Sequence, residues 1–183
     1  MTRLPMIAED KLTDAQRAAI KTVTQGKRGG IRGPFAALLR SPELCARAAH
    51  LGEFCRFETS LPDRLSEMAI LITAYNWKAQ YEWFAHAPMA QKGGLADDII
   101  EAIRVGKKPA KMQDDEAVLY DYCTELYDTK RVSDATYAKA VKAFGENGAM
   151  ELLGISGYYS LVSMVLNTAK VELPAGTTPP FAE

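Results

Sequence analysis

Helix start and stop signals recur along this sequence, whereas signals for β-strands are missing. Thr13 is followed by Gln16 in a capping box that opens a helix ending near residue 25, and Pro42 follows Ser41 at a first helical position. Further segments with the helical period lie at about residues 61–77, 76–88, 95–105, 114–128, 133–144 and 147–169. Because runs of alternating apolar and polar residues are lacking, the sequence predicts an all-α fold.

Some boundaries and faces of these helices can also be predicted. We expect the helix that starts near residue 76 to end at Pro88, and the last helix to begin at Asn147, after a separate helix that begins at Ser133. The helix that begins at Pro42 has apolar residues at helical spacing along one side. We expect this side to face the core; its residues are Leu44, Ala48, Leu51 and Cys55.

Length and composition are typical of one globular domain. The chain has 183 residues, of which 48% are apolar and 25% are charged. We expect a single helical domain over residues 1–183 with a core at about residues 34–170. Residues 171–183 should form an extended tail that is mobile unless a neighbouring subunit holds it.

Charge and motif content exclude several classes of protein. The formal net charge is -1 and the basic residues are dispersed, so we expect no nucleic-acid partner. The N-terminus lacks the apolar core of a signal peptide, and no run of about 18 apolar residues predicts a membrane span. The three cysteines form no C-x-x-C pair and the two histidines lie far apart in the sequence, so we expect inert thiols and no metal site. These features indicate a cytoplasmic protein that does not bind membranes.

The segment NWKAQYEWFAHAP, residues 76–88, carries the first candidate for chemistry. Glu82 and His86 are four residues apart, so on a helix they lie on one face. A carboxylate beside an imidazole favours the protonated ring and fixes its orientation, which provides a group for proton transfer near neutral pH. The alternative is a surface pair that contributes only about 0.2–0.5 kcal/mol to helix stability.

Glu67 on the preceding helix is a second candidate. It comes directly before the apolar run from Met68 to Ala74, so it lies either at an exposed helix end or beside a partner inside the fold. If the two helices pack as an antiparallel pair, Glu67 and His86 are each about ten residues from the turn and can meet. The sequence thus permits a cluster of Glu67, His86 and Glu82.

Aromatic residues flank this cluster in the sequence. Trp77, Tyr81 and Trp83 could wall a small substrate pocket and exclude water from it. Aromatic residues at helical spacing are also common in protein cores, so both interpretations stay open.

The spacing of these residues resembles a known signature. In the alkylhydroperoxidase D-like superfamily a glutamate precedes a C-x-x-C pair, and a histidine follows four residues after the second cysteine. Here Glu67, Ala79, Glu82 and His86 occupy these positions, so both redox cysteines are replaced. The chain is similar to the carboxymuconolactone decarboxylase branch, in which E-x-x-x-H replaces the cysteine motif. The resemblance covers most of the chain, through GPFAALLRSPEL, HAPMAQKGGL and GYYSLVSMVLN.

This resemblance implies an all-helical protein that assembles into homo-oligomers, trimers or hexamers. It also implies a cofactor-independent decarboxylation of a small lactone or carboxylic acid. His86 would donate the proton, Glu82 would hold its tautomer, and Glu67 would relay the proton or orient the ring. Arg32 in GGIRGPF is the candidate that pairs with the substrate carboxylate, or else a solvated loop charge.

Two alternatives to a lyase remain at this stage. An alkylhydroperoxidase or peroxiredoxin-type activity needs a thiolate nucleophile and a resolving thiol, which positions 79 and 82 do not provide. A non-catalytic binding protein with the same fold is the other.

Gly154 and Gly157 lie on nearly one side of the last helix, where they permit close approach of a helix from the same chain or from a partner.

Overall fold

The computed structural model describes residues 1–27 and 29–182, and every regular element in these residues is helical. This confirms the predicted all-α fold. The elements are η1 (Glu9–Lys11), α1 (Asp14–Gln25), α2 (Pro34–Leu38), α3 (Pro42–Phe57), α4 (Asp63–Asn76), α5 (Gln80–Lys92), α6 (Asp97–Arg104), α7 (Asp114–Thr129) and α8 (Asp134–Ala169).

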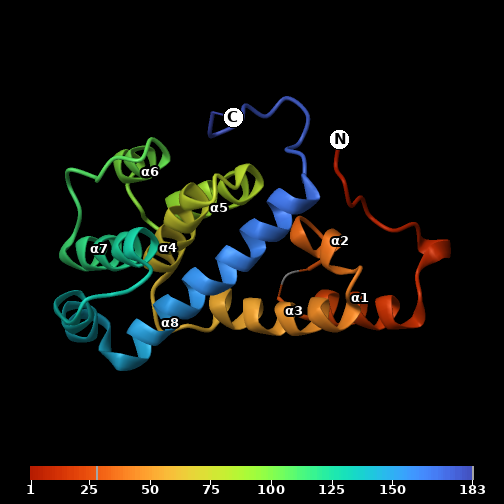
Figure 1. Cartoon of the computed structure of the whole chain (residues 1–183), viewed down its shortest axis with the longest axis horizontal. Coiled ribbons are helices and arrows are strands. Elements are labelled where there is room, and N and C mark those ends of the chain that lie inside the picture. Colours follow the sequence, from red (N-terminus) through yellow and green to blue (C-terminus); the bar gives the residue numbers. More distant parts are fainter. Residues whose placement is uncertain (28, 183) are drawn as a thin grey trace.

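Helix α8 runs diagonally through the molecule and separates two groups of helices (Figure 1). On one side it packs against α4, α5 and α7, and on the other side against α2 and α3. Helix α1 packs on α3, and α6 covers α4 and α5. The residues that carry the candidate chemistry therefore lie on the α4–α5 pair, next to the central helix.

Helix α4 is buried on all of its sides. Every residue from Leu65 to Ala74 is buried, as expected of a helix that is apolar around its whole circumference. The polar side chains inside this run have partners. Thr73 hydrogen-bonds through its hydroxyl to the Ala69 carbonyl and to the Tyr127 hydroxyl, at 2.8 and 2.7 Å. Glu67 has its partner on α5, as described below.

Helix α8 is interrupted at Gly145, whose φ and ψ angles are 71° and 170°. The predicted separation into two helices is present, but the break lies two residues before the predicted start at Asn147. Glycine takes this positive φ without steric cost, so it sets the position of the break. The Asn147 side chain does not cap a helix; it donates to Glu151 at 2.9 Å and to Ser60 at 3.4 Å.

By length and composition, α8 is also the one described helix that is apolar enough to cross a membrane. Its most apolar window has a mean hydropathy of 1.4, and half of that window is buried inside the fold. The central helix of a soluble core passes the same test, so these properties are weak evidence for a membrane span.

Two other sequence predictions about helices are wrong. Helix α5 does not end at Pro88 but continues to Lys92, although a proline inside a helix removes one N–H donor and crowds the preceding turn. On α3, Leu44 and Leu51 are exposed, and the core face is made by small residues: Cys45, Ala48, Ala49, Gly52 and Cys55. These small side chains let α3 approach α1 and α8 closely, whereas the larger leucines lie outside.

The C-terminal tail is extended, as expected, and contacts the α4–α5 pair near its end. Phe181 is only 6% exposed, and its main chain is hydrogen-bonded to the Gln80 side chain. Residue 183, the last of the predicted tail, lies outside the described residues. Phe181 therefore packs on the α4–α5 pair of its own chain.

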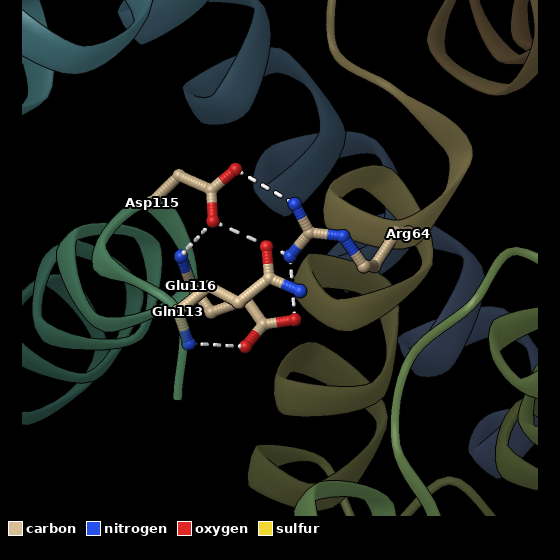
Figure 2. A network of polar contacts seen from close by, with 4 residues as sticks. All are labelled: Arg64, Gln113, Asp115 and Glu116. Carbon is tan, nitrogen blue, oxygen red and sulfur yellow. Dashed lines mark hydrogen bonds and ion pairs between the residues drawn. The ribbon is translucent and has the colours of Figure 1, made fainter. Parts of the chain in front are cut away.

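A polar network joins the start of α4 to the start of α7 (Figure 2). Arg64 donates to Asp115 at 2.7 Å and to Glu116 at 2.5 Å. Glu116 also accepts from the Gln113 main chain at 2.7 Å, as part of a capping box. Since Glu116 is only 2% exposed, the network pairs a buried carboxylate and fixes where α4 begins.

Candidate active site

His86 lies between two carboxylates, one from its own helix and one from α4. Its Nδ1 is 2.7 Å from Glu67 Oε2, and its Nε2 is 3.0 Å from Glu82 Oε1. All three side chains are buried. The helix pair thus brings together the three residues that the sequence analysis grouped, through an (i, i+4) pair on α5 and a turn of only three residues, Trp77–Ala79.

The hydrogen bonds indicate that the His86 ring carries two protons. A neutral imidazole donates from one nitrogen only, whereas both nitrogens of His86 face carboxylates. Burial by itself would lower the pKa of His86, but the charge of Glu82 and the hydrogen bonds to Glu67 and Glu82 raise it to about 9. At neutral pH the ring is therefore an imidazolium, and it can act as a proton donor.

A cavity of about 270 Å³ opens beside this cluster. His86 and Glu82 contribute to its wall from α5. Gly30 and residues 32–35 contribute from the loop before α2 and its first turn, and α8 contributes Tyr158, Tyr159 and Val162. The Tyr159 ring contacts the His86 ring edge to face, with 5.1 Å between centroids. The cavity wall thus combines aromatic and aliphatic side chains with the polar groups of the cluster.

Arg32 and Tyr81 line the same cavity as His86. Between them lies Gly33, which has a φ of 53°. A Cβ atom at this residue would lie 2.8 Å from Tyr81 Cε1. Glycine is therefore required both by the backbone conformation and by the close approach of the Tyr81 ring.

The two tryptophans do not line the cavity, so the prediction that they wall the pocket is wrong. Trp83 is buried and packs edge to face on Phe181, with 5.3 Å between ring centroids. Trp77 ends α4, and its carbonyl accepts a hydrogen bond from Asn167 at 2.8 Å. Because successive helix positions are about 100° apart, Tyr81 and Trp83 point to different neighbours although they are close in sequence.

Arg56, near the end of α3, also lines the cavity and was not identified from the sequence. Its guanidinium donates to Met89 Sδ at 2.9 Å and lies over the Phe57 ring at 4.9 Å. Neither Arg32 nor Arg56 forms an ion pair with an acidic residue in the described part of the chain. Two cations of the cavity wall are therefore available to an anionic ligand.

The arrangement of Glu67, Glu82 and His86 does not suit a metal ion. Within residues 1–27 and 29–182, no group of three or more His, Cys, Asp or Glu side chains is arranged to hold a metal ion. Both ring nitrogens of His86 are already bonded to carboxylates, which leaves no lone pair on the ring for a cation. His50, the other histidine, is exposed on α3.

The three cysteines are buried. Burial raises the pKa of Cys45 to about 11. It also raises the pKa of Cys123 to about 12, against the opposing hydrogen bond to Ser156. Thiols with such pKa values hold almost no thiolate at neutral pH and react poorly with peroxides.

Comparisons with known proteins identify the fold. The chain is similar to the crystal structure of an uncharacterized peroxidase-related protein from Silicibacter sp. TM1040, with a TM-score of 0.74 and 15% sequence identity. The likeness covers 95% of this chain and 92% of that one. No protein-family model matches the chain, and no curated protein sequence matches it. The fold is the all-α alkylhydroperoxidase D-like fold.

Proposed function

We propose that this protein is a cofactor-independent acid/base enzyme that acts on a small carboxylic or lactone acid, in the manner of a carboxymuconolactone decarboxylase. One observation carries the proposal: a buried imidazolium held on both nitrogens by Glu67 and Glu82 in the wall of a cavity. The same geometry would be costly as a purely structural feature, because three ionisable groups are removed from water. Perturbed titratable groups of this kind beside a cavity are typical of catalytic sites.

The chemistry of a decarboxylation fits the protonation state of the cluster. The bond between carbon and the carboxylate breaks, CO₂ leaves, and the electron pair stays on carbon as an enolate-like charge. For this step the substrate carbon takes the place of Glu82 at His86 Nε2, the Nε2 proton is transferred to the carbon, and the ring then regains a proton from solvent while Nδ1 stays on Glu67. Glu67 and Glu82 keep the ring oriented and keep it protonated between turnovers.

The cations of the cavity wall favour an anionic substrate. The cluster combines two acidic side chains with one basic side chain, and this balance by itself disfavours a carboxylate ligand. Two arginines in the cavity wall offset this charge. Arg32 lies in the loop before α2, and Arg56 lies near the end of α3. A planar guanidinium can also pair with a carboxylate through two hydrogen bonds.

The thiol peroxidase alternative has less support. Ala79 and Glu82 occupy the positions of the redox cysteines in the superfamily signature, and Cys45, Cys55 and Cys123 are all buried. Peroxide reduction needs an accessible thiolate and a second thiol that resolves its oxidised form. Buried thiols also fit a reducing compartment, so we place the protein in the cytoplasm as part of the proposal.

A substrate screen tests the proposed reaction. The purified protein is incubated with a panel of lactone acids and β-keto acids, and release of CO₂ is measured. We expect turnover on at least one member, and negligible reduction of organic hydroperoxides by a dithiol donor in a parallel assay. Peroxide reduction that is lost when Cys45, Cys55 or Cys123 is replaced by serine would contradict the proposal.

We further propose that the protein forms a homo-oligomer, a trimer or a hexamer, through α3 and α8. Both helices expose apolar side chains, among them Leu51 and Phe54 on α3 and Met150 and Leu153 on α8. A Cβ atom at Gly154 or Gly157 would meet nothing within 4 Å, so packing within the chain does not require these glycines. Such an exposed apolar surface is typical of an interface.

Light scattering tests this assembly. We expect a mass of three or six times the 20.1 kDa chain. Leu153→Glu should lower it, because a charge in an apolar interface is unpaired. Val105→Glu, at an exposed valine that ends α6, is the matched control and should leave the mass unchanged. A wild-type mass of 20.1 kDa would exclude the oligomer.

A further inference from the structure

The end of the chain is bound as if it were an extended peptide ligand. Gln80 contacts the main chain of Phe181 twice: its Nε2 donates to the carbonyl at 2.8 Å, and its Oε1 accepts from the N–H at 3.0 Å. Arg104 on α6 donates to the Pro180 carbonyl at 2.7 Å and is itself held by Glu101. Three hydrogen bonds therefore fix the backbone of two consecutive residues.

The Phe181 side chain supplies the apolar part of this contact. Its ring packs edge to face on Trp83 and Tyr75, with centroids 5.3 and 6.0 Å away. The Lys78 ammonium lies 5.3 Å from the centroid of the Phe181 ring and 3.3 Å from that of Tyr75. One aromatic side chain thus joins the end of α4, the turn and the first turn of α5.

The contacts of Phe181 lie at the α4–α5 turn, where the local sequence does little to stabilise the observed backbone. Lys78 in the turn has a φ of 49°, a conformation that residues with a side chain rarely adopt. Ala79 is the N-cap of α5 and has no side chain that can accept from the first N–H groups of the helix. The start of α5 therefore depends on tertiary contacts, and the bound tail provides them at Lys78, Gln80 and Trp83.

The start of α5 also determines the geometry of the acid/base cluster. Glu82 lies between Gln80 and Trp83, both of which contact Phe181, and His86 follows one turn later on the same helix. Glu67 belongs to α4, on the other side of the turn. A change in the Trp77–Ala79 turn would therefore move Glu82 and His86 together relative to Glu67.

We propose that residues 180–182 act as a positioning strap, which docks through Phe181 on the α4–α5 turn and holds His86 in register with Glu67. The strap recognises its site through main-chain atoms and one aromatic ring, so a free peptide that contains residues 180–182 should also bind there. Phe181 acts through α5 and is a positioning residue. This inference does not depend on the proposed reaction, because it concerns the geometry of the cluster and not turnover.

Nuclear magnetic resonance of the histidine rings tests the strap in the full-length protein. The chain has two histidines, so His50, exposed on α3, serves as the internal reference. In Phe181→Ala we expect the pKa of His86 to fall by about one unit or more, because its contact with Glu67 loosens. We expect backbone amides of α5 to exchange about tenfold faster or more. Tyr137→Ala, at an exposed aromatic residue far from the tail in sequence, is the matched control and should change neither quantity.

A peptide of residues 174–182, PAGTTPPFA, completes the test. Added in excess to Phe181→Ala, it should restore the pKa of His86 and the slow exchange of α5, whereas the same peptide with alanine in place of phenylalanine should not. If Phe181→Ala does not fold, Gln80→Ala, which removes only the two hydrogen bonds, is measured in its place and should show the same shifts in smaller size. An unchanged pKa of His86 and unchanged exchange of α5 in the folded variant would overturn the strap, as would failure of the peptide to restore them. If the substrate screen finds no turnover, by contrast, the proposed reaction fails, but the pKa of His86 and the amide exchange of α5 can still test the strap.

Discussion

Replacing His86 by glutamine is expected to lower kcat/KM, on any substrate found in the screen, by about 10²- to 10⁴-fold. The pKa of His86 is raised to about 9, so its ring carries a transferable proton at neutral pH. Glutamine has a similar length and can still donate to one carboxylate, but its amide does not transfer a proton. The loss should appear mainly in kcat, because the arginines of the cavity wall remain in place.

The matched control for this variant is His50→Gln, at the other histidine of the chain, which is exposed and should keep full activity. Circular dichroism should show the same helix content for both variants. If His86→Gln keeps its turnover, the cluster is structural. If the wild type shows no turnover, and His86→Gln binds a ligand with the same affinity as the wild type, the protein is a binding protein.

The pH dependence of the wild type follows from the same ring. Because His86 acts as a proton donor, the rate should fall as pH rises through about 9, where the imidazolium is lost. The stability has the same sign. A pKa raised from 6.5 in the unfolded chain to about 9 in the folded protein contributes stability that is complete below pH 6.5 and is lost as pH rises through about 9. In His86→Gln this alkaline loss of stability should be smaller.

The acid/base cluster was predictable because its geometry is local. Glu82 and His86 are neighbours on any helix, and Glu67 needs only one tight turn between two helices to reach them. The periodicity that predicted the helices therefore also predicted this contact. The break in α8 was predictable for a similar reason, since a glycine near its position interrupts the helical pattern.

Contacts between distant segments were not predictable from the same patterns. Arg56 reaches the cavity because α3 crosses α8 and lies near the end of α5, which no spacing reveals. Phe181 was assigned to a mobile tail because its partners, Gln80 and Trp83, are about one hundred residues away. The exposed leucines of α3 were expected to face the core, because periodicity shows that a helix has an apolar side without showing whether another helix of the same chain covers it.

The polar network at the start of α4 leads to the largest expected effect on stability. Arg64→Met should lower the free energy of unfolding by about 3–5 kcal/mol, because Glu116 would keep a buried charge without its partner. The contribution of Asp115 to this effect is small, since its side chain is 36% exposed and solvent screens the charge. Chemical denaturation at neutral pH measures the change. Arg47→Met is the matched control, because its partner Glu43 is as exposed as Arg47 itself, and the loss there should be below about 1 kcal/mol.

A second substitution separates the unpaired charge from the loss of packing. Glu116→Gln, added to Arg64→Met, removes the buried charge but keeps an oxygen that accepts from the Gln113 main chain. If the unpaired carboxylate is the cause, the double variant should be more stable than Arg64→Met alone, although a charged pair has been removed. If the double variant is less stable than the single one, the stabilisation comes from packing of the arginine stem and not from its charge. Arg64 precedes Glu67 by one turn of α4, so in the single variant the pKa of His86 should fall as well, whereas in Arg47→Met it should not change.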